Sequence, residues 1–159
     1  HQWLTNMRRT SNTTFSTPTK DTNTAHGNAH WRLGHGQYKT NDVTKHVTWN
    51  ANSFFKRVRQ GEFAVLLQQN PNVDTIHITE LRHEMKQDEL ETWELRKALE
   101  TMGFRHAIWN WCLDTPGNHG SAILSKIPIK EVTYGLTDGL ADYEGRTITT
   151  KLEDHSIIW

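Results

Sequence analysis

The sequence has one cysteine and no long apolar run, and each of these features excludes a class of protein. A single cysteine among 159 residues excludes an internal disulfide and any metal site built from several cysteines, and it is typical of a reducing compartment. No stretch approaches the roughly 18 apolar residues that indicate a membrane-spanning helix, so no membrane span is predicted. Apolar residues make up only 35 % of the chain, below the usual share in globular domains. Most of them must therefore serve one modest core.

The net charge is zero, from 18 basic and 18 acidic residues, but the basic and acidic residues are unevenly distributed along the chain. Residues 1–44 hold five basic residues, two acidic ones and 17 Ser, Thr or Asn, whereas residues 45–159 hold 13 basic and 16 acidic residues. We interpret residues 1–44 as a polar basic N-terminal arm and residues 45–159 as the folded domain. The arm is either solvated surface or a segment that binds an anionic partner, foremost nucleic acid. In the second case, its nucleic-acid-binding cations include Arg8, Arg9, Lys20 and Arg32.

Residues 1–20 contain basic and hydroxyl side chains and no acidic residue. This composition is typical of an organellar transit region or its remnant, and the alternative is an ordinary disordered tail. On the first interpretation we expect a mitochondrial or other organellar matrix location. Trp3 and Trp31 lie in the polar arm without a core of their own, which indicates that the arm packs against this domain or against a partner.

Hydrophobic periodicity in residues 43–159 predicts a strand, a helix, a strand and a helix, followed by consecutive strands. The predicted helices are one whose apolar face runs from Phe54 to Leu67, interrupted by Gly61, and one over 88–102 that ends at a left-handed Gly103. The predicted strands are 43–49, 73–79, 104–112, 121–125, 130–134, 146–152 and 155–159. This order predicts an α+β fold, in which helices cover one face of a mixed sheet.

Three polar residues follow the first two predicted strands. Glu80 ends one strand, and Asn50 and Asn52 come directly after the other. A carboxylate at the C-terminal end of a buried strand lies where α/β sheets bind ligands, and two amides beside it can orient a hard cation with its water shell. The alternatives are a strand-end carboxylate at the surface and, for Asn52, the cap of the next helix.

The ten histidines do not form a recognisable metal-binding pattern. His26, His30 and His35 lie close together, but no cysteine or acidic residue completes a set of ligands. We interpret His77, inside a predicted strand, as a core or interface residue. His119 lies in a glycine-bounded turn before a strand, where its imidazole either meets a phosphate or is an ordinary loop side chain.

Five short motifs occur in order along the folded part of the chain: residues 48–53 with Asn-Ala-Asn, 71–80, 117–126, 132–135 and 144–146. In these motifs residues 45–159 resemble the N-terminal half of the exonuclease III-type apurinic/apyrimidinic (AP) endonucleases, members of the endonuclease/exonuclease/phosphatase superfamily. The resemblance implies half of a four-layer α/β/β/α sandwich, with one mixed β-sheet and helices on its outer face. It also implies an apolar, uncovered inner sheet face and a terminal strand with an unpaired edge.

The resemblance implies a site as well. Glu80 would bind Mg²⁺, Asn52 would assist at the metal, and Asn50 would orient the active-site network for hydrolysis of DNA beside an abasic site, a DNA-repair reaction. However, the family's later catalytic motifs would lie beyond Trp159. In addition, the usual Gln is missing before Glu80, and Asn118 stands where the family has an aromatic residue. We therefore predict that this chain alone binds Mg²⁺ poorly and cleaves nothing.

Two hypotheses of different classes follow. The first is a non-catalytic structural subunit of a larger, organellar ribonucleoprotein assembly, for example a mitochondrial ribosome, which would contact RNA. The second is a split enzyme: a Mg²⁺-dependent DNA phosphodiesterase completed by a second chain or by a C-terminal half. Both hypotheses require a second protein chain or segment over the inner sheet face.

Overall fold

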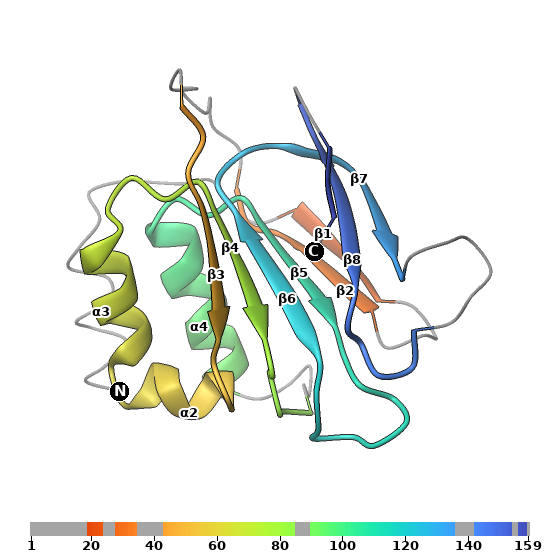
Figure 1. Ribbon diagram of the computed structural model, residues 1–159. Helices are drawn as coiled ribbons and strands as arrows, with labels where there is room; N and C mark the ends of the chain where they lie inside the picture. Colours follow the sequence, from red (N-terminus) through yellow and green to blue (C-terminus); the bar gives the residue numbers. More distant parts are fainter. Residues whose placement is uncertain are drawn as a thin grey trace.

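The computed structural model describes residues 19–23, 28–34, 43–84, 90–135, 142–153 and 156–158. Within these residues the chain forms a six-stranded mixed sheet, helices on one of its faces, and a three-stranded sheet on the other side (Figure 1). Arg8 and Arg9 lie outside the described residues. None of the described helices is long and apolar enough to cross a membrane.

The large sheet has the strand order β1-β2-β5-β6-β4-β3. Its β3 and β4 are parallel, and its other neighbouring strands are antiparallel. The predicted mixed sheet is thereby confirmed, with four of its strands at the predicted places. The six strands are β1 (Thr19–Asn23), β2 (Asn28–Arg32), β3 (His46–Asn50), β4 (Thr75–Thr79), β5 (His106–Asn110) and β6 (Ser121–Ser125).

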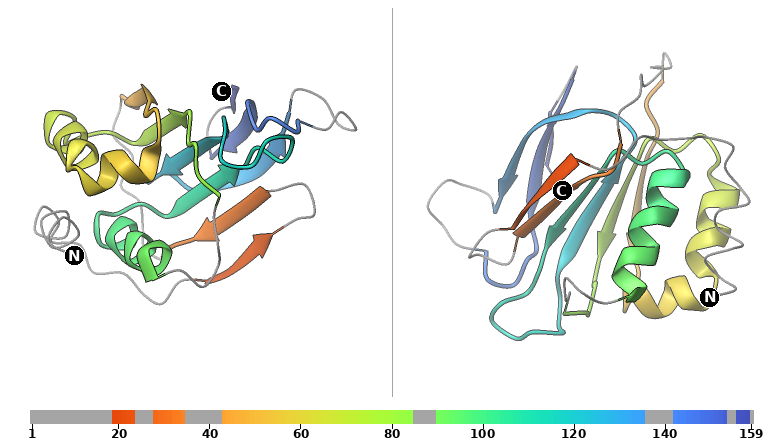
Figure 2. Two further views of the ribbon diagram at one scale, coloured as in Figure 1. Left: turned by 90° about the horizontal axis from the view of Figure 1, so that it is seen from below. Right: turned by 180° about the vertical axis from the view of Figure 1, so that it is seen from behind.

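Helices α2 (Phe54–Arg59), α3 (Glu62–Gln69) and α4 (Leu90–Thr101) cover one face of this sheet (Figure 2). The single helix predicted from Phe54 to Leu67 is two helices, because Gly61 has a φ of 81° and caps the start of α3. A left-handed residue cannot continue a right-handed helix. Gly103, with a φ of 97°, follows α4 as predicted.

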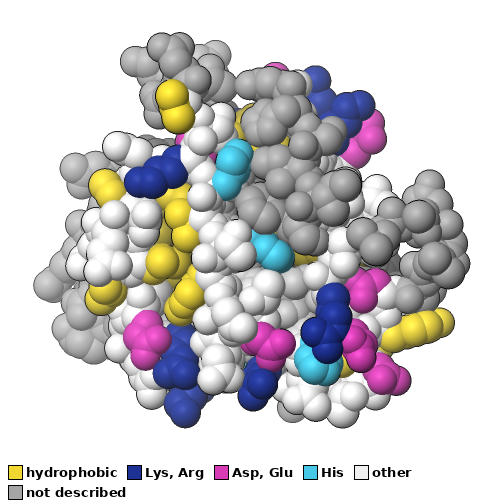
Figure 3. Space-filling model, in the orientation of Figure 1, with side chains coloured by type: hydrophobic (Ala, Val, Ile, Leu, Met, Phe, Trp, Pro, Cys, Tyr) yellow, Lys and Arg dark blue, Asp and Glu magenta, His cyan; other side chains and the backbone are white. Residues whose placement is uncertain are grey.

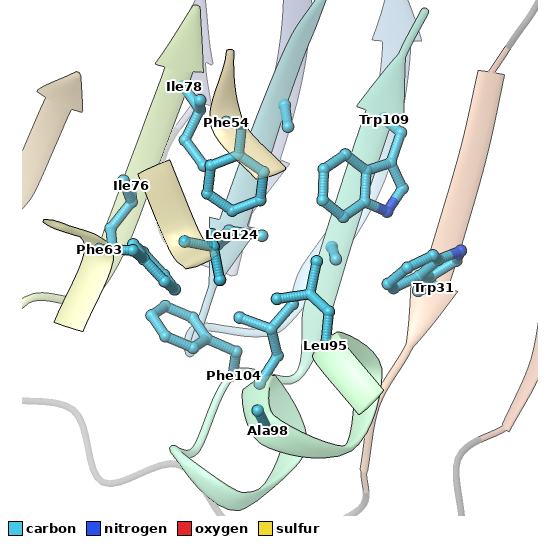
Figure 4. Packing of buried hydrophobic residues seen from close by; sticks show 14 of the residues in the cluster. Trp31, Phe54, Phe63, Ile76, Ile78, Leu95, Ala98, Phe104, Trp109 and Leu124 are labelled. Carbon is cyan, nitrogen blue, oxygen red and sulfur yellow. The ribbon is translucent and has the colours of Figure 1, made fainter. Parts of the chain in front are cut away.

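The main core lies between the large sheet and the helices. Trp109 and Leu124 point from the sheet toward Phe54 and Leu95 of the helices (Figure 4). Phe54 packs edge-on against Phe63, with ring centroids 5.4 Å apart. Each such side chain, when fully buried, contributes roughly 1.5–3 kcal/mol, so this layer holds the helices on the sheet.

Part of the segment that we interpreted as an arm is built into the sheet. β1 and β2 lie within residues 1–44, and β2 pairs along its whole length with β5. Trp31 is only 5 % exposed and packs edge-on against Trp109, with ring centroids 5.0 Å apart (Figure 4). Trp31 thus packs against the domain itself, which explains an aromatic residue in so polar a segment.

A second, antiparallel sheet lies on the other side of the large sheet (Figures 1 and 2). It has the order β7-β8-β9, formed by β7 (Ile129–Tyr134), β8 (Ile148–Leu152) and β9 (Ser156–Ile158). Its apolar side chains form a small core with two residues of the large sheet, Ile108 and Ile123. The chain therefore supplies three strands of a second sheet in addition to the predicted mixed one.

The inner face of the large sheet, opposite the helices, is polar, which corrects the expectation of an apolar face. Side chains alternate along each strand, and the described ones that point away from the helices include only two apolar residues, Ile108 and Ile123. The others are Asn28, His30, Arg32, His46, Thr48, Asn50, Thr75, His77, Thr79, His106, Asn110, Ser121 and Ser125. A polar inner face accounts for much of the low apolar content.

Polar groups of the inner face bond to one another across the strands. His30 Nε2 and His106 Nδ1 are 2.8 Å apart, and the Ile129 amide donates to His106 Nε2 at 3.3 Å. Burial lowers the pKa of His30 and of His77 to about 4. Burial, followed by the nearby His30, lowers the pKa of His106 to about 3. These histidines are therefore neutral at pH 7, and the hydrogen bonds of His30 and His106 reduce the cost of burying those two.

Candidate functional site

The ends of four neighbouring strands meet at one edge of the large sheet. The pairing register places Asn50 beside Thr79, Thr79 beside Ser121, and Ser121 beside Asn110. Glu80 directly follows Thr79 and therefore lies at the same edge as Asn50. The parallel pairing of β3 and β4 brings these two predicted site residues together, as expected for the carboxyl ends of parallel strands.

Backbone strain is concentrated at this edge. Every non-glycine residue with positive φ in the described part of the chain lies here, namely Asn52, Ser53, Glu80, Arg82 and His119. The Ser53 amide donates to the Glu80 carbonyl, and the Arg82 amide donates to the His119 carbonyl, each at 2.9 Å. A left-handed conformation costs a non-glycine residue roughly 1–2 kcal/mol, and such strain clusters at functional sites. The strain therefore marks this edge as the candidate site.

The Glu80 carboxylate is 22 % exposed and lies between two donors. Its Oε2 accepts from Arg82 Nε at 2.9 Å, and its Oε1 lies 3.8 Å from His119 Nδ1. The hydrogen bond from Arg82 holds the pKa of Glu80 below its ordinary value, although partial burial opposes the shift. Glu80 is therefore ionised at neutral pH, and each of its oxygens faces a donor of the protein.

The row of polar side chains continues beyond His119. Arg146 Nη2 lies 3.3 Å from both ring nitrogens of His119, and Arg146 Nε pairs with Glu144. Basic, histidine and acidic side chains gather at the lower right of Figure 3. Both Arg146 and Glu144 are about half exposed, so an incoming ligand can exchange with this ion pair at little cost.

One carboxylate holds the loop that carries Arg146. Asp142 Oδ2 accepts from the amides of Arg146 at 2.8 Å and Thr147 at 2.7 Å, and from Asn110 Nδ2 at 3.0 Å. Asn110 is itself buried at the end of β5. We did not single out Asp142 or Asn110 from the sequence, because 32 residues separate them and no local motif contains both.

Gly145 completes this anchor, and no residue with a side chain fits at its position without a shift of the loop. Its φ is 67°, and a Cβ at this position would lie 2.3 Å from the Asn110 carbonyl oxygen. The buried Ser121 hydroxyl donates to the Gly145 carbonyl at 2.7 Å, and the Gly120 amide donates to the Glu144 carbonyl at 3.2 Å. The Glu-Gly-Arg motif is thus packed directly against the ends of β5 and β6.

The described residues do not by themselves fit the Mg²⁺ site that the resemblance implies. Glu80 has the right chemistry, but Arg82 and His119 already face its oxygens. Asn50 Oδ1 accepts the Asn52 amide at 3.1 Å in a local turn. Among the residues that the structure describes, no group of three or more His, Cys, Asp or Glu side chains is arranged to hold a metal ion. A hard cation at this edge would keep several waters and would need the Glu80 oxygens, which face Arg82 and His119 here.

The predicted nucleic-acid-binding residues do not all gather at this edge. His119 does, because it lies 3.8 Å from Glu80. Arg32 pairs with His106 at the opposite end of β2, four residues or about 13 Å along the strand from Asn28. There it lines a cavity of about 200 Å³ near Tyr134. The side chain of Lys20 lies outside the described residues.

Comparison with known proteins gives matches among solved structures only. No model of a known protein family and no curated protein sequence matches the chain. A 3′-5′ exonuclease from Neisseria meningitidis aligns with a TM-score of 0.53 and 29 % identity, over 70 % of this chain and 39 % of its own. A 3′ phosphatase from Neisseria bound to a product DNA hairpin aligns with a TM-score of 0.54 and 30 % identity, over 73 % and 40 %.

An AP endonuclease from Archaeoglobus fulgidus aligns with a TM-score of 0.53 and 24 % identity, over 73 % of this chain and 40 % of its own. At that identity, the likeness concerns the fold alone. The chain spans about two fifths of the length of each of these three proteins.

Proposed function

Because the chain has the fold of part of an exonuclease III-type AP endonuclease, we propose that it forms one half of a nucleic-acid phosphodiesterase site. In this proposal the chain contributes the edge around Glu80, binds a nucleic-acid phosphate there, and does not hydrolyse it unaided. A second protein chain or segment supplies the remaining catalytic groups, and with them the Mg²⁺ ligands that the described residues lack.

The observation that carries the proposal is the strained turn that presents Glu80. A carboxylate held by a left-handed backbone, between Arg82 and His119, is costly to maintain without a use. The three cationic or imidazole side chains around it, those of Arg82, His119 and Arg146, are suited to the oxygens of one phosphate. Glu80 would then be released from its present partners and become available to a cation brought by the second half.

The proposal that the chain does not act unaided rests on the number of groups at the site. Hydrolysis of a phosphodiester needs a positioned base for water and stabilisation of the leaving oxygen. In the described residues, Glu80 is the carboxylate that faces His119 and Arg82, Glu144 is paired with Arg146, and Asp142 Oδ2 accepts three hydrogen bonds that hold its loop. The edge therefore supports binding better than catalysis.

A non-catalytic role remains the second proposal, and the paired state of Glu80 favours it. In that role the chain is a structural subunit of a larger, organellar ribonucleoprotein, such as a mitochondrial ribosome, and its edge contacts RNA. The organellar location remains a prediction from the composition of residues 1–20. The two proposals differ in the partner: a chain with further catalytic carboxylates for the split enzyme, or unrelated protein and RNA for the structural subunit.

The experiment is purification of the native complex under mild conditions, mass spectrometry of what accompanies the chain, and assay of that complex on duplex DNA with one abasic site. The half-site proposal predicts a nuclease-like partner and Mg²⁺-dependent cleavage that Glu80→Gln removes. The matched control is Glu62→Gln, an exposed carboxylate on α3, which leaves cleavage unchanged. If ribosomal proteins accompany the chain and the complex does not cleave the DNA, the structural role is supported instead. Efficient cleavage by the isolated chain would refute both proposals.

A further inference from the structure

The candidate site has an exposed apolar rim that the proposed function leaves unused. The described residues include six large hydrophobic side chains that are exposed. Two of them lie on loops that adjoin the site edge: Leu113, 38 % exposed, follows Asn110 by three residues, and Tyr143, 57 % exposed, precedes Gly145 and Arg146. The other four lie elsewhere, at the start of the segment before β3 and on helices α3 and α4: Val43, Val65, Leu90 and Trp93.

Tyr143 and Leu113 come from different loops that are joined by their backbones. The amides of Leu113 and Asp114 both donate to the Tyr143 carbonyl, at 2.7 and 3.1 Å. The loop that contains Tyr143 is further held by the three hydrogen bonds to the Asp142 carboxylate. Tyr143 is thus presented by an anchored backbone, and its exposure is a property of the folded loop.

The rim adjoins the polar groups of the site. Arg146 follows Tyr143 by three residues in the same loop, and its guanidinium contacts His119, which faces Glu80. Hydrophobic side chains lie beside basic and acidic ones at the lower right of Figure 3. An exposed aromatic residue and an exchangeable arginine therefore belong to one anchored loop beside His119.

We propose that Tyr143, with Leu113 beside it, is a stacking platform for an unpaired base of a nucleic-acid strand whose phosphate contacts Arg146. The proposal rests on the proposed function, because it names how that site holds its strand. Exposed aromatic rings beside cations bind single strands with little sequence preference, and base stacking contributes roughly 1–3 kcal/mol per base. An aromatic ring on the same loop as an arginine that contacts an imidazole suits the base and the phosphate of a nucleotide, so the proposal commits to a nucleic-acid strand.

The test is fluorescence anisotropy of a labelled single-stranded oligonucleotide with the full chain, in EDTA so that no hydrolysis intervenes. Tyr143→Ala is expected to raise the dissociation constant about 5- to 150-fold, the equivalent of one lost stacking contact. Tyr143→Phe retains the ring and is expected to bind within about twofold of the wild type. DNA and RNA strands of the same sequence show which sugar the site accepts.

Two further variants keep the result interpretable. Trp93→Ala removes a similarly exposed aromatic side chain, 54 % exposed on α4, and is expected to leave affinity unchanged. Tyr143→Leu preserves apolar area without an aromatic face, and is expected to bind as weakly as Tyr143→Ala. An unchanged urea midpoint for each variant confirms that it is folded. Unaltered affinity of Tyr143→Ala, equal loss in Trp93→Ala, or no binding by the wild type would overturn the platform.

The platform and the half-site fail in different experiments. If Glu80→Gln abolishes cleavage by the native complex while Tyr143→Ala binds normally, the platform is refuted and the half-site stands. If strand binding depends on Tyr143 but the native complex cleaves nothing, the half-site is refuted and the platform stands.

Discussion

Replacing Gly145 by alanine tests the packing of the candidate site most directly. Gly145 has a φ of 67°, and a Cβ there would lie 2.3 Å from the Asn110 carbonyl oxygen, where contacts under 3.0 Å are essentially never seen. The loop must therefore move by at least 0.7 Å to accept the methyl group. Such a shift opposes the buried hydrogen bond from Ser121 and the bond between the Gly145 amide and the Asp142 carbonyl.

The magnitude follows from these terms. The left-handed backbone costs alanine about 1 kcal/mol, and weakening two hydrogen bonds adds about 1–3 kcal/mol for each buried group left unsatisfied. We expect Gly145→Ala to lower the free energy of unfolding by about 3–7 kcal/mol. The matched control is Gly117→Ala, because Gly117 also has a positive φ, 87°, but nothing lies within 4 Å of its would-be Cβ.

The assay is urea unfolding followed by the fluorescence of the seven tryptophans, two of which, Trp31 and Trp109, are buried in the core. Gly117→Ala is expected to lose about 1 kcal/mol, for its backbone conformation alone. The difference between the two variants isolates the contact with Asn110. If that difference is below about 1 kcal/mol, the close approach of the loop to β5 is refuted.

Three other predictions concern ionisation and the core. Stability, measured by the urea midpoint, is expected to be level above pH 6.5 and to fall from pH 6.5 toward pH 4, by up to about 1.4 kcal/mol per pH unit per histidine. The reason is that the histidines take up protons in the unfolded chain but not in the folded chain. A urea midpoint that does not change over this range would contradict the low pKa values of His30, His77 and His106. Arg82→Gln is expected to raise the pKa of Glu80, since the Arg82 hydrogen bond is the main cause of its lowering; carboxyl-carbon NMR titration measures it, and an unchanged pKa would show that Arg82 does not hold Glu80. In the same unfolding assay, Trp31→Ala is expected to lower the free energy of unfolding by about 3–5 kcal/mol, and Trp93→Ala by less than about 1 kcal/mol. Similar decreases for the two variants would mean that β2 is not part of the core.

Much of the secondary structure could be predicted from local patterns. The apolar run at 73–79 predicts β4 to within two residues, and Gly103 marks the end of α4. The strands after α4 also occur in the predicted order, with shorter bounds. These features depend on neighbours in the chain, so periodicity and turn residues are enough to find them.

β1 and β2 could not be predicted in the same way. Their residues are mostly polar, and the composition of residues 1–44 is that of an arm. What makes β2 a strand is its pairing with β5 and the packing of Trp31 on Trp109, 78 residues later in the chain. The expectation of an apolar inner face came from the family resemblance, whereas the residues of that face are mostly polar and are accommodated by contacts between distant strands, such as that of His30 with His106.

Local patterns predicted which residues follow the strands at 43–49 and 73–79, and therefore that Asn50 and Glu80 would share one edge of the sheet if the two strands are neighbours. The parallel pairing of β3 with β4 makes them neighbours. Only the tertiary structure decided how Glu80 is used, since its partner His119 and the anchor formed by Asp142, Asn110 and Gly145 come from distant segments. Contacts of this kind depend on the register and spacing of packed strands, which no local pattern records. The same packing placed Arg32 at the far end of β2 and Tyr143 on the rim of the site.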